Sequence, residues 1–222
     1  MQRAKLDEAG NMTDKIKDTA EQIMNDYPQV SYIHCAIIII SLRIIMASNV
    51  CQIVTFNLYG FNQGCSYLVE LLKSNDIICV QEHWLSSIDF SKLTNLDNNF
   101  TVLCSSAMED VLSKGPLRGR PFGGVAIFIR NSIIKKLKVI GIRERSIIVQ
   151  INNMLLLNVY MPCNDPDIFA DVLGGISDIL ANIDRSVLHT VLAGDFNCSP
   201  VDGSTIGNLL NTFLCELTCV AL

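Results

Sequence analysis

Short apolar runs of strand length recur along this chain from residue 50 onward, and polar or turn-forming residues follow each one. These runs lie at residues 50–56, 77–80, 100–104, 125–130, 147–151, 155–160 and 187–193. Apolar residues at helical spacing lie at 63–73, 167–183 and 204–214. In the helix expected at 167–183, Ile168 and Ile176 belong to the inward face. Strands mixed with helices in this order predict an α/β (α+β) sandwich of largely antiparallel sheets with helices outside.

The composition is that of a globular protein with a sizeable core. The chain has 222 residues, of which 50% are hydrophobic and 18% charged, which excludes a disordered protein. Its formal net charge of −5 argues against broad electrostatic binding to nucleic acid. It leaves room for an enzyme that holds phosphate through a metal ion.

Nine cysteines occur without a pairing pattern, and several of them lie within apolar runs. No secretory signal opens the chain, so reduced thiols in an intracellular protein, nuclear or cytoplasmic, are expected.

Residues 1–48 differ in character from the remainder and are expected to form an N-terminal extension to a domain at 49–222. Residues 14–27 have the spacing of an amphipathic helix. The apolar segment at 35–46 is shorter than the roughly 20 residues of a membrane span, and Arg43 interrupts it. We expect a β-rich segment there and no membrane association, with a membrane anchor as the alternative.

Gly194-Asp195-Phe196-Asn197 follows the apolar run at 187–193. Side chains two residues apart on a strand point to the same face, so Asp195 and Asn197 deliver a carboxylate and a carboxamide together. Such a pair suits a metal-bound water or a phosphate, although both residues are also common in turns.

Polar residues end three other strand-like runs: Asn57, Glu82 and Tyr160. Oxygen-rich side chains such as Glu82 and Asn57 suit a hard cation such as Mg²⁺. Asp195 could aim or deprotonate water, while Tyr160 and Asn197 could donate hydrogen bonds to a phosphate. Each residue alone could be a solvated strand end. Their recurrence after apolar strands favours a shared site.

The phrases around these residues resemble the endonuclease/exonuclease/phosphatase superfamily, which has the DNase I-like fold. They are Thr-Phe-Asn57-Leu-Tyr-Gly, Cys-Val-Gln-Glu82-His-Trp-Leu, Leu-Asn-Val-Tyr160-Met-Pro and Leu-Ala-Gly-Asp195-Phe-Asn197. Gln-Glu-His-Trp-Leu and Gly-Arg-Pro-Phe-Gly-Gly-Val-Ala are more narrowly similar to the apurinic-type endonuclease domain of non-LTR (LINE-type) retrotransposon polyproteins. The similarity spans about residues 49–203.

This resemblance implies a four-layer α/β sandwich that cleaves phosphodiesters with Mg²⁺ or Mn²⁺, here nicking target DNA for reverse transcription. It implies that Asn57 and Glu82 serve the metal and that Tyr160 contacts the phosphate or its surroundings. By the same resemblance Asp195 orients or activates water, and Asn197 contacts the phosphate.

The family pattern closes with a Ser-Asp-His-like motif, whereas the three histidines of this chain are His34, His83 and His189. None of them follows Asn197. We therefore expect a truncated domain that lacks its last strands, with bare sheet edges and impaired or absent activity. His83 would face away from Glu82 on a strand and is expected to be structural.

Arg118 and Arg120, in the loop at 114–124, are candidates for contact with DNA phosphates, with a solvated loop as the alternative. Two other functions stay open. The chain could be an inactive fragment without chemistry, or an enzyme of the same fold acting on lipids or nucleotides.

Overall fold

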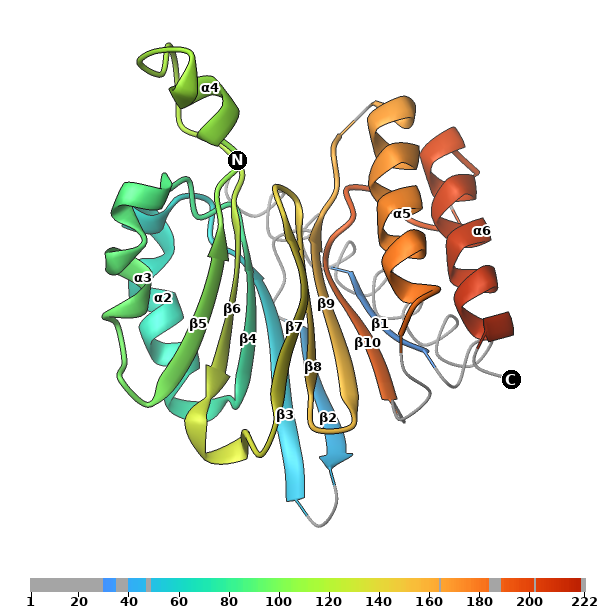
Figure 1. Cartoon of the computed structure of the whole chain (residues 1–222), viewed down its shortest axis with the longest axis horizontal. Helices are drawn as coiled ribbons and strands as arrows, with labels where there is room; N and C mark the ends of the chain where they lie inside the picture. The colour runs from blue at the N-terminus through green and yellow to red at the C-terminus, as the bar shows by residue number, and fades with distance from the viewer. Residues whose placement is uncertain are drawn as a thin grey trace, which may run out of the picture.

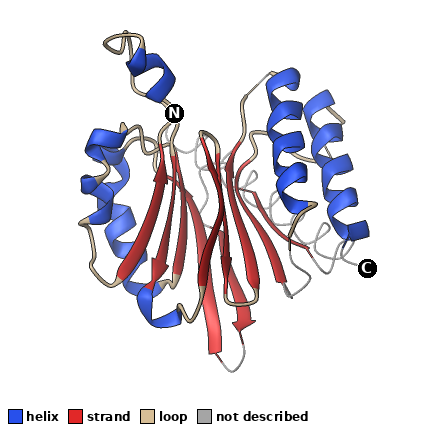
Figure 2. Cartoon of the chain, in the orientation of Figure 1, coloured by secondary structure: helices blue, strands red, loops and turns tan. Residues whose placement is uncertain are grey.

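Two five-stranded sheets lie face to face at the centre of the protein, and helices cover their outer faces (Figure 1). The computed structural model describes residues 30–34, 40–46, 49–163, 165–183, 189–201 and 203–220. In Figure 2 the strands form the middle of the molecule and most of the helices lie on its two flanks. This order of helix, sheet, sheet and helix confirms the predicted four-layer α/β sandwich.

The first sheet has the strand order β2-β3-β4-β6-β5. Its strands are β2 (Ile40–Met46), β3 (Asn49–Asn57), β4 (Ile77–Gln81), β6 (Val125–Arg130) and β5 (Phe100–Ser105). β3 and β4 are parallel, with Asn57 beside Gln81, and the other pairs are antiparallel. Because parallel strands end at the same edge, the residues that follow β3 and β4 emerge together.

The second sheet has the order β1-β10-β9-β8-β7. Its strands are β1 (Val30–His34), β10 (His189–Asp195), β9 (Met154–Tyr160), β8 (Ser146–Ile151) and β7 (Leu137–Arg143). β8 and β9 form an antiparallel hairpin, and β9 and β10 are parallel with Tyr160 beside Asp195. β1 pairs with the other side of β10 and forms the edge of this sheet.

Helices pack on the outer face of each sheet. On the first sheet lie α2 (Phe61–Ser74), the 3₁₀ turn η1 (Ser87–Asp89) and α3 (Ser91–Thr94). On the second lie α5 (Pro166–Leu180) and α6 (Thr205–Val220). A second 3₁₀ turn, η2 (Asn131–Ile133), follows β6. The short α4 (Glu109–Ser113) stands beyond the end of the sheets at which β3, β4 and β5 finish (Figure 1).

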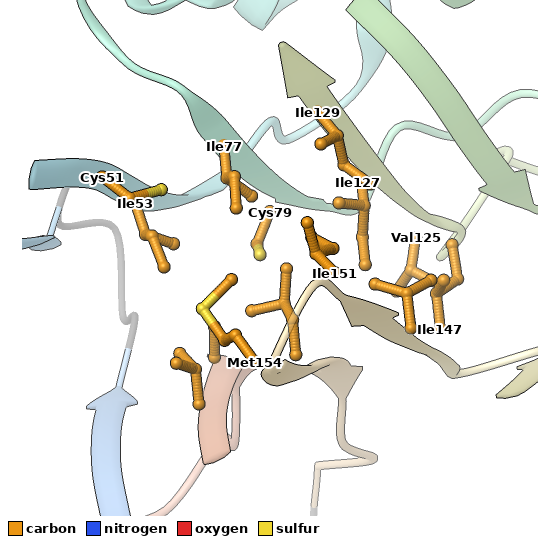
Figure 3. Close-up of a cluster of buried hydrophobic side chains, with 14 residues drawn as sticks. Cys51, Ile53, Ile77, Cys79, Val125, Ile127, Ile129, Ile147, Ile151 and Met154 are labelled. Atoms are coloured by element: carbon orange, nitrogen blue, oxygen red, sulfur yellow. The ribbon is translucent and has the colours of Figure 1, made fainter. Parts of the chain in front are cut away.

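The main core lies between the two sheets (Figure 3). Isoleucines from both sheets meet there at zero exposure, among them Ile53, Ile77 and Ile127 of the first sheet and Ile147 of the second. Burial of each such side chain stabilises the folded state by about 1.5–3 kcal/mol. This core sets how the two sheets face each other, and it thereby positions the strand ends at the rim.

Some details differ from the expectations. Ile168 is 45% exposed, because the buried face of α5 is centred on Phe169, Leu173 and Ile176 and Ile168 lies at its margin. Strand β7 was not expected at all. The helix expected at 14–27 and residues 35–39 lie outside the described part of the chain, whereas 40–46 is a strand as predicted. The domain boundary at residue 48 stays a prediction, and strands on both sides of it join the sheets.

Among the described residues, no helix has the length and apolar character needed to cross a bilayer. Among the described cysteines, five are free thiols: Cys51, Cys65, Cys79, Cys104 and Cys163.

Candidate active site

Asn57 joins the two sheets at the rim where the parallel strands end. Its carboxamide nitrogen donates to Glu82 Oε1 at 3.1 Å and to Asp195 Oδ2 at 2.9 Å. Its carboxamide oxygen accepts the backbone N–H of Tyr59 at 3.0 Å. One amide therefore ties an acid that follows the first sheet to an acid that ends the second.

The Glu82 carboxylate is surrounded by hydrogen-bond donors. Besides Asn57, the indole nitrogen of Trp84 donates to Glu82 Oε2 at 3.2 Å, and the Tyr160 hydroxyl donates to the same carboxylate. Burial raises the pKa of Tyr160, and the hydrogen bond and charge of Glu82 raise it further. Tyr160 is consequently a neutral O–H donor across the physiological pH range.

Asp195 is nearly buried, at 4% exposure. The backbone N–H of Asn197 donates to Asp195 Oδ1 at 3.1 Å. Burial raises the pKa of Asp195, the hydrogen bonds from Asn57 and Asn197 lower it, and the charge of Glu82 raises it again, with a net upward shift. A buried acid whose ionisation is disfavoured by a neighbouring carboxylate defines a site suited to a cation.

The loops around this cluster adopt strained backbone conformations. Tyr59, Glu82, Trp84 and Asn197 all have positive φ, between 51° and 56°. Non-glycine residues rarely adopt this region, and such residues concentrate at functional sites. Hydrogen bonds hold the loops in this state, including Gly60 N–H to the Glu82 carbonyl at 2.8 Å.

The structure brings together Asn57, Glu82, Tyr160 and Asp195 as the sequence predicted. Asn197 lies at the same rim and is exposed, but its carboxamide nitrogen donates to the Met161 carbonyl at 2.7 Å. The expected role of Asn57 as a metal ligand meets one complication, because its nitrogen and not its oxygen faces the two acids.

The two candidate DNA-contacting arginines differ. The guanidinium carbon of Arg120 lies 4.0 Å from the centroid of the Trp84 ring, which places it next to the cluster. Within the described part of the chain, no hydrogen bond, ion pair or ring contact joins Arg118 to the cluster. Arg118 is exposed in the same loop.

Sequence reasoning missed Trp84 and Arg145 as parts of this region. Trp84 lies two residues after Glu82, a spacing that could have indicated a shared face. Arg145 lies at the turn between β7 and β8, with its guanidinium carbon 5.7 Å from the Tyr160 ring centroid. Strand β7, which leads into this turn, was not expected, so no signal in the sequence placed Arg145 near the cluster.

His83 and His189 lie outside the cluster. His83 is fully buried, accepts the Leu85 N–H at Nδ1 (3.0 Å) and contacts the Ser105 carbonyl through Nε2 (3.0 Å). These contacts agree with the structural role predicted for it. His189 opens β10, at the end of the strand remote from Asp195.

The donor set fits a magnesium-like cation, although no group of three or more His, Cys, Asp or Glu side chains gathers anywhere in the described ranges. Mg²⁺ is usually bound by only one or two carboxylates, with waters and substrate phosphates completing its shell. Glu82 and Asp195, both hydrogen-bonded to one amide, can supply those carboxylates.

The fold and the cluster define an α/β sandwich of the DNase I-like class. A family model of the Endonuclease/Exonuclease/phosphatase family matches residues 54–217, and the chain belongs to that family. No curated protein sequence matches the chain.

Solved structures share the fold at low sequence identity. The 3′ phosphatase NExo from Neisseria, bound to a product DNA hairpin, is 20% identical with a TM-score of 0.54, and the match covers 74% of this chain and 70% of that one. An AP endonuclease from Archaeoglobus fulgidus is 18% identical with a TM-score of 0.53, covering 75% and 70%. The catalytic domain of Xenopus laevis APE2 is 18% identical with a TM-score of 0.50, covering 72% and 67%.

Proposed function

We propose that this protein hydrolyses phosphodiester bonds in DNA with a divalent cation, Mg²⁺ or Mn²⁺, and that it acts as a nicking endonuclease. One observation carries the proposal: Asn57, Glu82, Tyr160 and Asp195 form a single hydrogen-bonded cluster across the two sheets. Membership of the family supports hydrolysis, and the DNA product in the NExo structure supports DNA as the substrate class.

The acidic residues take different roles in this proposal. Glu82 would hold the cation, and Asn57 would keep Glu82 and Asp195 at a fixed separation. Asn57 could also join the cation through the second lone pair of its oxygen. A bound divalent cation would neutralise negative charge on the phosphate oxygens.

Asp195 would orient and deprotonate the attacking water. Its raised pKa makes its carboxylate a stronger base than an exposed aspartate, which favours proton transfer near neutral pH. The Tyr160 hydroxyl, on releasing its hydrogen bond to Glu82, and the exposed Asn197 would donate hydrogen bonds to the phosphate as negative charge builds on it.

Nicking of supercoiled plasmid tests the proposal. We expect nicked circles with Mg²⁺ or Mn²⁺ and none with EDTA. Glu82→Ala and Asp195→Ala should each reduce the rate by at least ~100-fold, the scale of losing a cation ligand or a general base. Glu70→Ala is the matched control, because Glu70 is exposed on α2 and pairs with Lys73, so nicking should be unchanged. Equal rates in all three variants would rule the cluster out as the catalytic site.

A second candidate is a DNA-binding protein of this fold without hydrolysis. It is favoured by the positions of His83 and His189, because neither supplies an imidazole to the cluster. On this alternative, DNA binds but no nicks accumulate with either cation, even at high protein concentration.

We further propose a retroelement origin, supported by the phrases Gln-Glu-His-Trp-Leu at residues 81–85 and Gly-Arg-Pro-Phe-Gly-Gly-Val-Ala at 119–126. The coding sequence on either side can be translated and inspected for a polymerase domain and a Ser-Asp-His-like motif. If neither is encoded nearby, this origin is not supported.

A further inference from the structure

An arginine stacked on two aromatic rings stands beside the Glu82 carboxylate. The Arg120 guanidinium carbon lies 4.0 Å from the Trp84 ring centroid and 5.4 Å from that of Tyr59. The two rings are themselves 5.4 Å apart. Because the Trp84 indole donates to Glu82, the guanidinium is separated from the carboxylate by a single aromatic ring.

The backbone around Arg120 holds this stack in place. The Trp84 N–H donates to the Gly123 carbonyl at 2.9 Å, which ties the arginine loop to the loop that follows β4. Gly60 leaves room for the indole, since a Cβ there would lie 2.3 Å from Trp84 Cε3. Tyr59 and Trp84 both have positive φ. The two residues with this strained backbone are the ones whose rings contact the Arg120 guanidinium.

A second arginine lies over a ring of the cluster on the other sheet. The Arg145 guanidinium carbon is 5.7 Å from the Tyr160 ring centroid, and the Tyr160 N–H donates to the Arg145 carbonyl at 2.8 Å. Its Nε is 3.8 Å from the exposed carboxylate of Glu144, a long contact between partly solvated groups. Both arginines are therefore one ring away from Glu82, through Trp84 on one side and Tyr160 on the other.

A guanidinium that uses its flat face for an aromatic ring keeps its N–H edge for anions, and that edge matches a phosphate in geometry. Arg120 belongs to none of the ion pairs formed by the described residues, and it is exposed. The chain as a whole carries a net charge of −5. Cations at this rim are consequently needed to offset repulsion between a polyanion and the protein.

We propose that Arg120 and Arg145 bind the phosphates on either side of the cleaved one, so that the substrate is a polynucleotide strand and not a single phosphate ester. The inference rests on the proposed function for the identity of the central phosphate. It assigns the strand a path across the rim, from the Trp84 and Tyr59 stack to the Tyr160 ring.

The salt dependence of DNA binding tests this inference without hydrolysis. The affinity of a short fluorescent duplex is measured by anisotropy in EDTA over a series of salt concentrations. Each phosphate contact contributes about 0.9 to the slope of log affinity against log salt concentration. We expect Arg120→Ala and Arg145→Ala each to flatten the slope by about that amount, and the double variant by about twice as much.

Lys136→Ala is the matched control, because it removes the same charge from an exposed residue at the opposite end of the sheets. There the backbone carbonyl of Lys136 accepts the backbone N–H of the hairpin residue Asn152 at 2.8 Å. It should leave the slope unchanged. Arg120→Lys keeps the charge, so it should retain most of the slope even if Arg120→Ala is poorly folded. Inorganic phosphate should bind the wild-type protein and both arginine variants equally.

Trp84 is the sole tryptophan of the chain, so its emission reports on the Arg120 stack directly. DNA should change the emission of the wild-type protein and have a smaller effect on Arg120→Ala. Slopes that stay equal in wild type and both arginine variants would overturn the inference, as would a wild-type protein that does not bind DNA. Altered slopes in a protein that fails to nick would support the inference while refuting hydrolysis.

Discussion

At the scale of single residues, the turn after β4 sends three consecutive side chains to different places. Glu82 enters the cluster, His83 enters the protein interior, and Trp84 turns back to donate to Glu82. The positive φ of Glu82 and Trp84 makes this possible. Gly124 leaves space for the imidazole, because a Cβ there would lie 2.4 Å from His83 Cε1. His83 therefore supports the loop that presents the acid.

This burial predicts a loss of stability in acid. Burial lowers the pKa of His83 from 6.5 to about 4, although hydrogen bonds to the backbone of Ser105 and Val125 act in the opposite direction. Below pH 6.5 the His83 side chain binds a proton in the unfolded chain, whereas in the folded chain it does so only at about pH 4. The free energy of unfolding therefore decreases as the pH is lowered from 6.5 to about 4. The loss should be on the order of 2–3 kcal/mol.

Urea unfolding at neutral pH and near the lower limit of this interval measures the effect. Replacing His83 by Gln should reduce the difference between the two pH values, whereas His189→Gln, at an exposed histidine, should keep the wild-type difference. Asp195 opposes His83, because its raised pKa favours the folded state in acid, and it does so equally in all three proteins. A His83→Gln protein with the wild-type pH dependence would contradict the assignment.

At the scale of elements, strands buried on both faces were predictable from composition, whereas the edge strand β7 was not. β4 and β6 are continuous apolar runs because sheet and helix cover them, so composition alone locates them. β7 is an edge strand with Val139 and Ile142 about half exposed, and its register shifts between Val139 and Gly141. A bulge breaks the two-residue alternation by which a half-exposed strand is recognised.

Polar residues buried between the sheets tie β4 to β9 just below the site. The Gln81 carboxamide donates to Asn158 Oδ1 at 2.6 Å and to Thr55 Oγ1 at 3.0 Å. Asn158 donates to the carbonyls of Val80 and Ala126, at 3.0 and 2.9 Å. All three side chains have zero exposure, so each bond made here replaces one to water. Gln81 and Asn158 are chain neighbours of the site residues and link the strands that carry them.

Replacing Asn158 by Leu should therefore destabilise the fold by about 2–5 kcal/mol, because Gln81 and the carbonyls of Val80 and Ala126 each lose a buried hydrogen bond. The double variant with Gln81→Leu should lose less than the sum of the two single variants, since both polar partners are then removed. Urea unfolding measures all three. Asn182→Leu, at an exposed residue after α5, should change stability by less than about 0.5 kcal/mol. Additive losses in the double variant would argue against a coupled network.

At the scale of the whole molecule, each sheet supplies half of the site. Asn57 and Glu82 come from the first sheet and Tyr160 and Asp195 from the second. The sequence predicted this set because a polar residue recurs directly after each of several apolar strands. It could not predict that the Asn57 nitrogen faces the acids or that Trp84 and Arg145 flank them. Those features depend on residues with positive φ and on the edge strand β7, and neither produces a regular pattern of apolar residues in the sequence.

A site divided between the sheets predicts that a bound cation stabilises the whole fold. A cation held by Glu82, next to the Asp195 carboxylate, would bind the folded state only, because the unfolded chain separates these two acids by more than a hundred positions. At a cation concentration a hundredfold above Kd, the gain is about 2.7 kcal/mol. The melting temperature should therefore rise with Mg²⁺ or Mn²⁺ in the wild-type protein and return on adding EDTA.

Glu82→Gln and Asp195→Asn should each lose most of this rise, whereas Glu70→Gln, at an exposed acid on α2, should keep it. Because Asn57 also bonds both acids, the two sheets remain joined without the cation, and the EDTA-treated protein should still unfold in one transition. A melting temperature that rises equally in all four proteins would place cation binding elsewhere on the surface. In that case the two acids would repel each other across the rim with no cation to offset their charge.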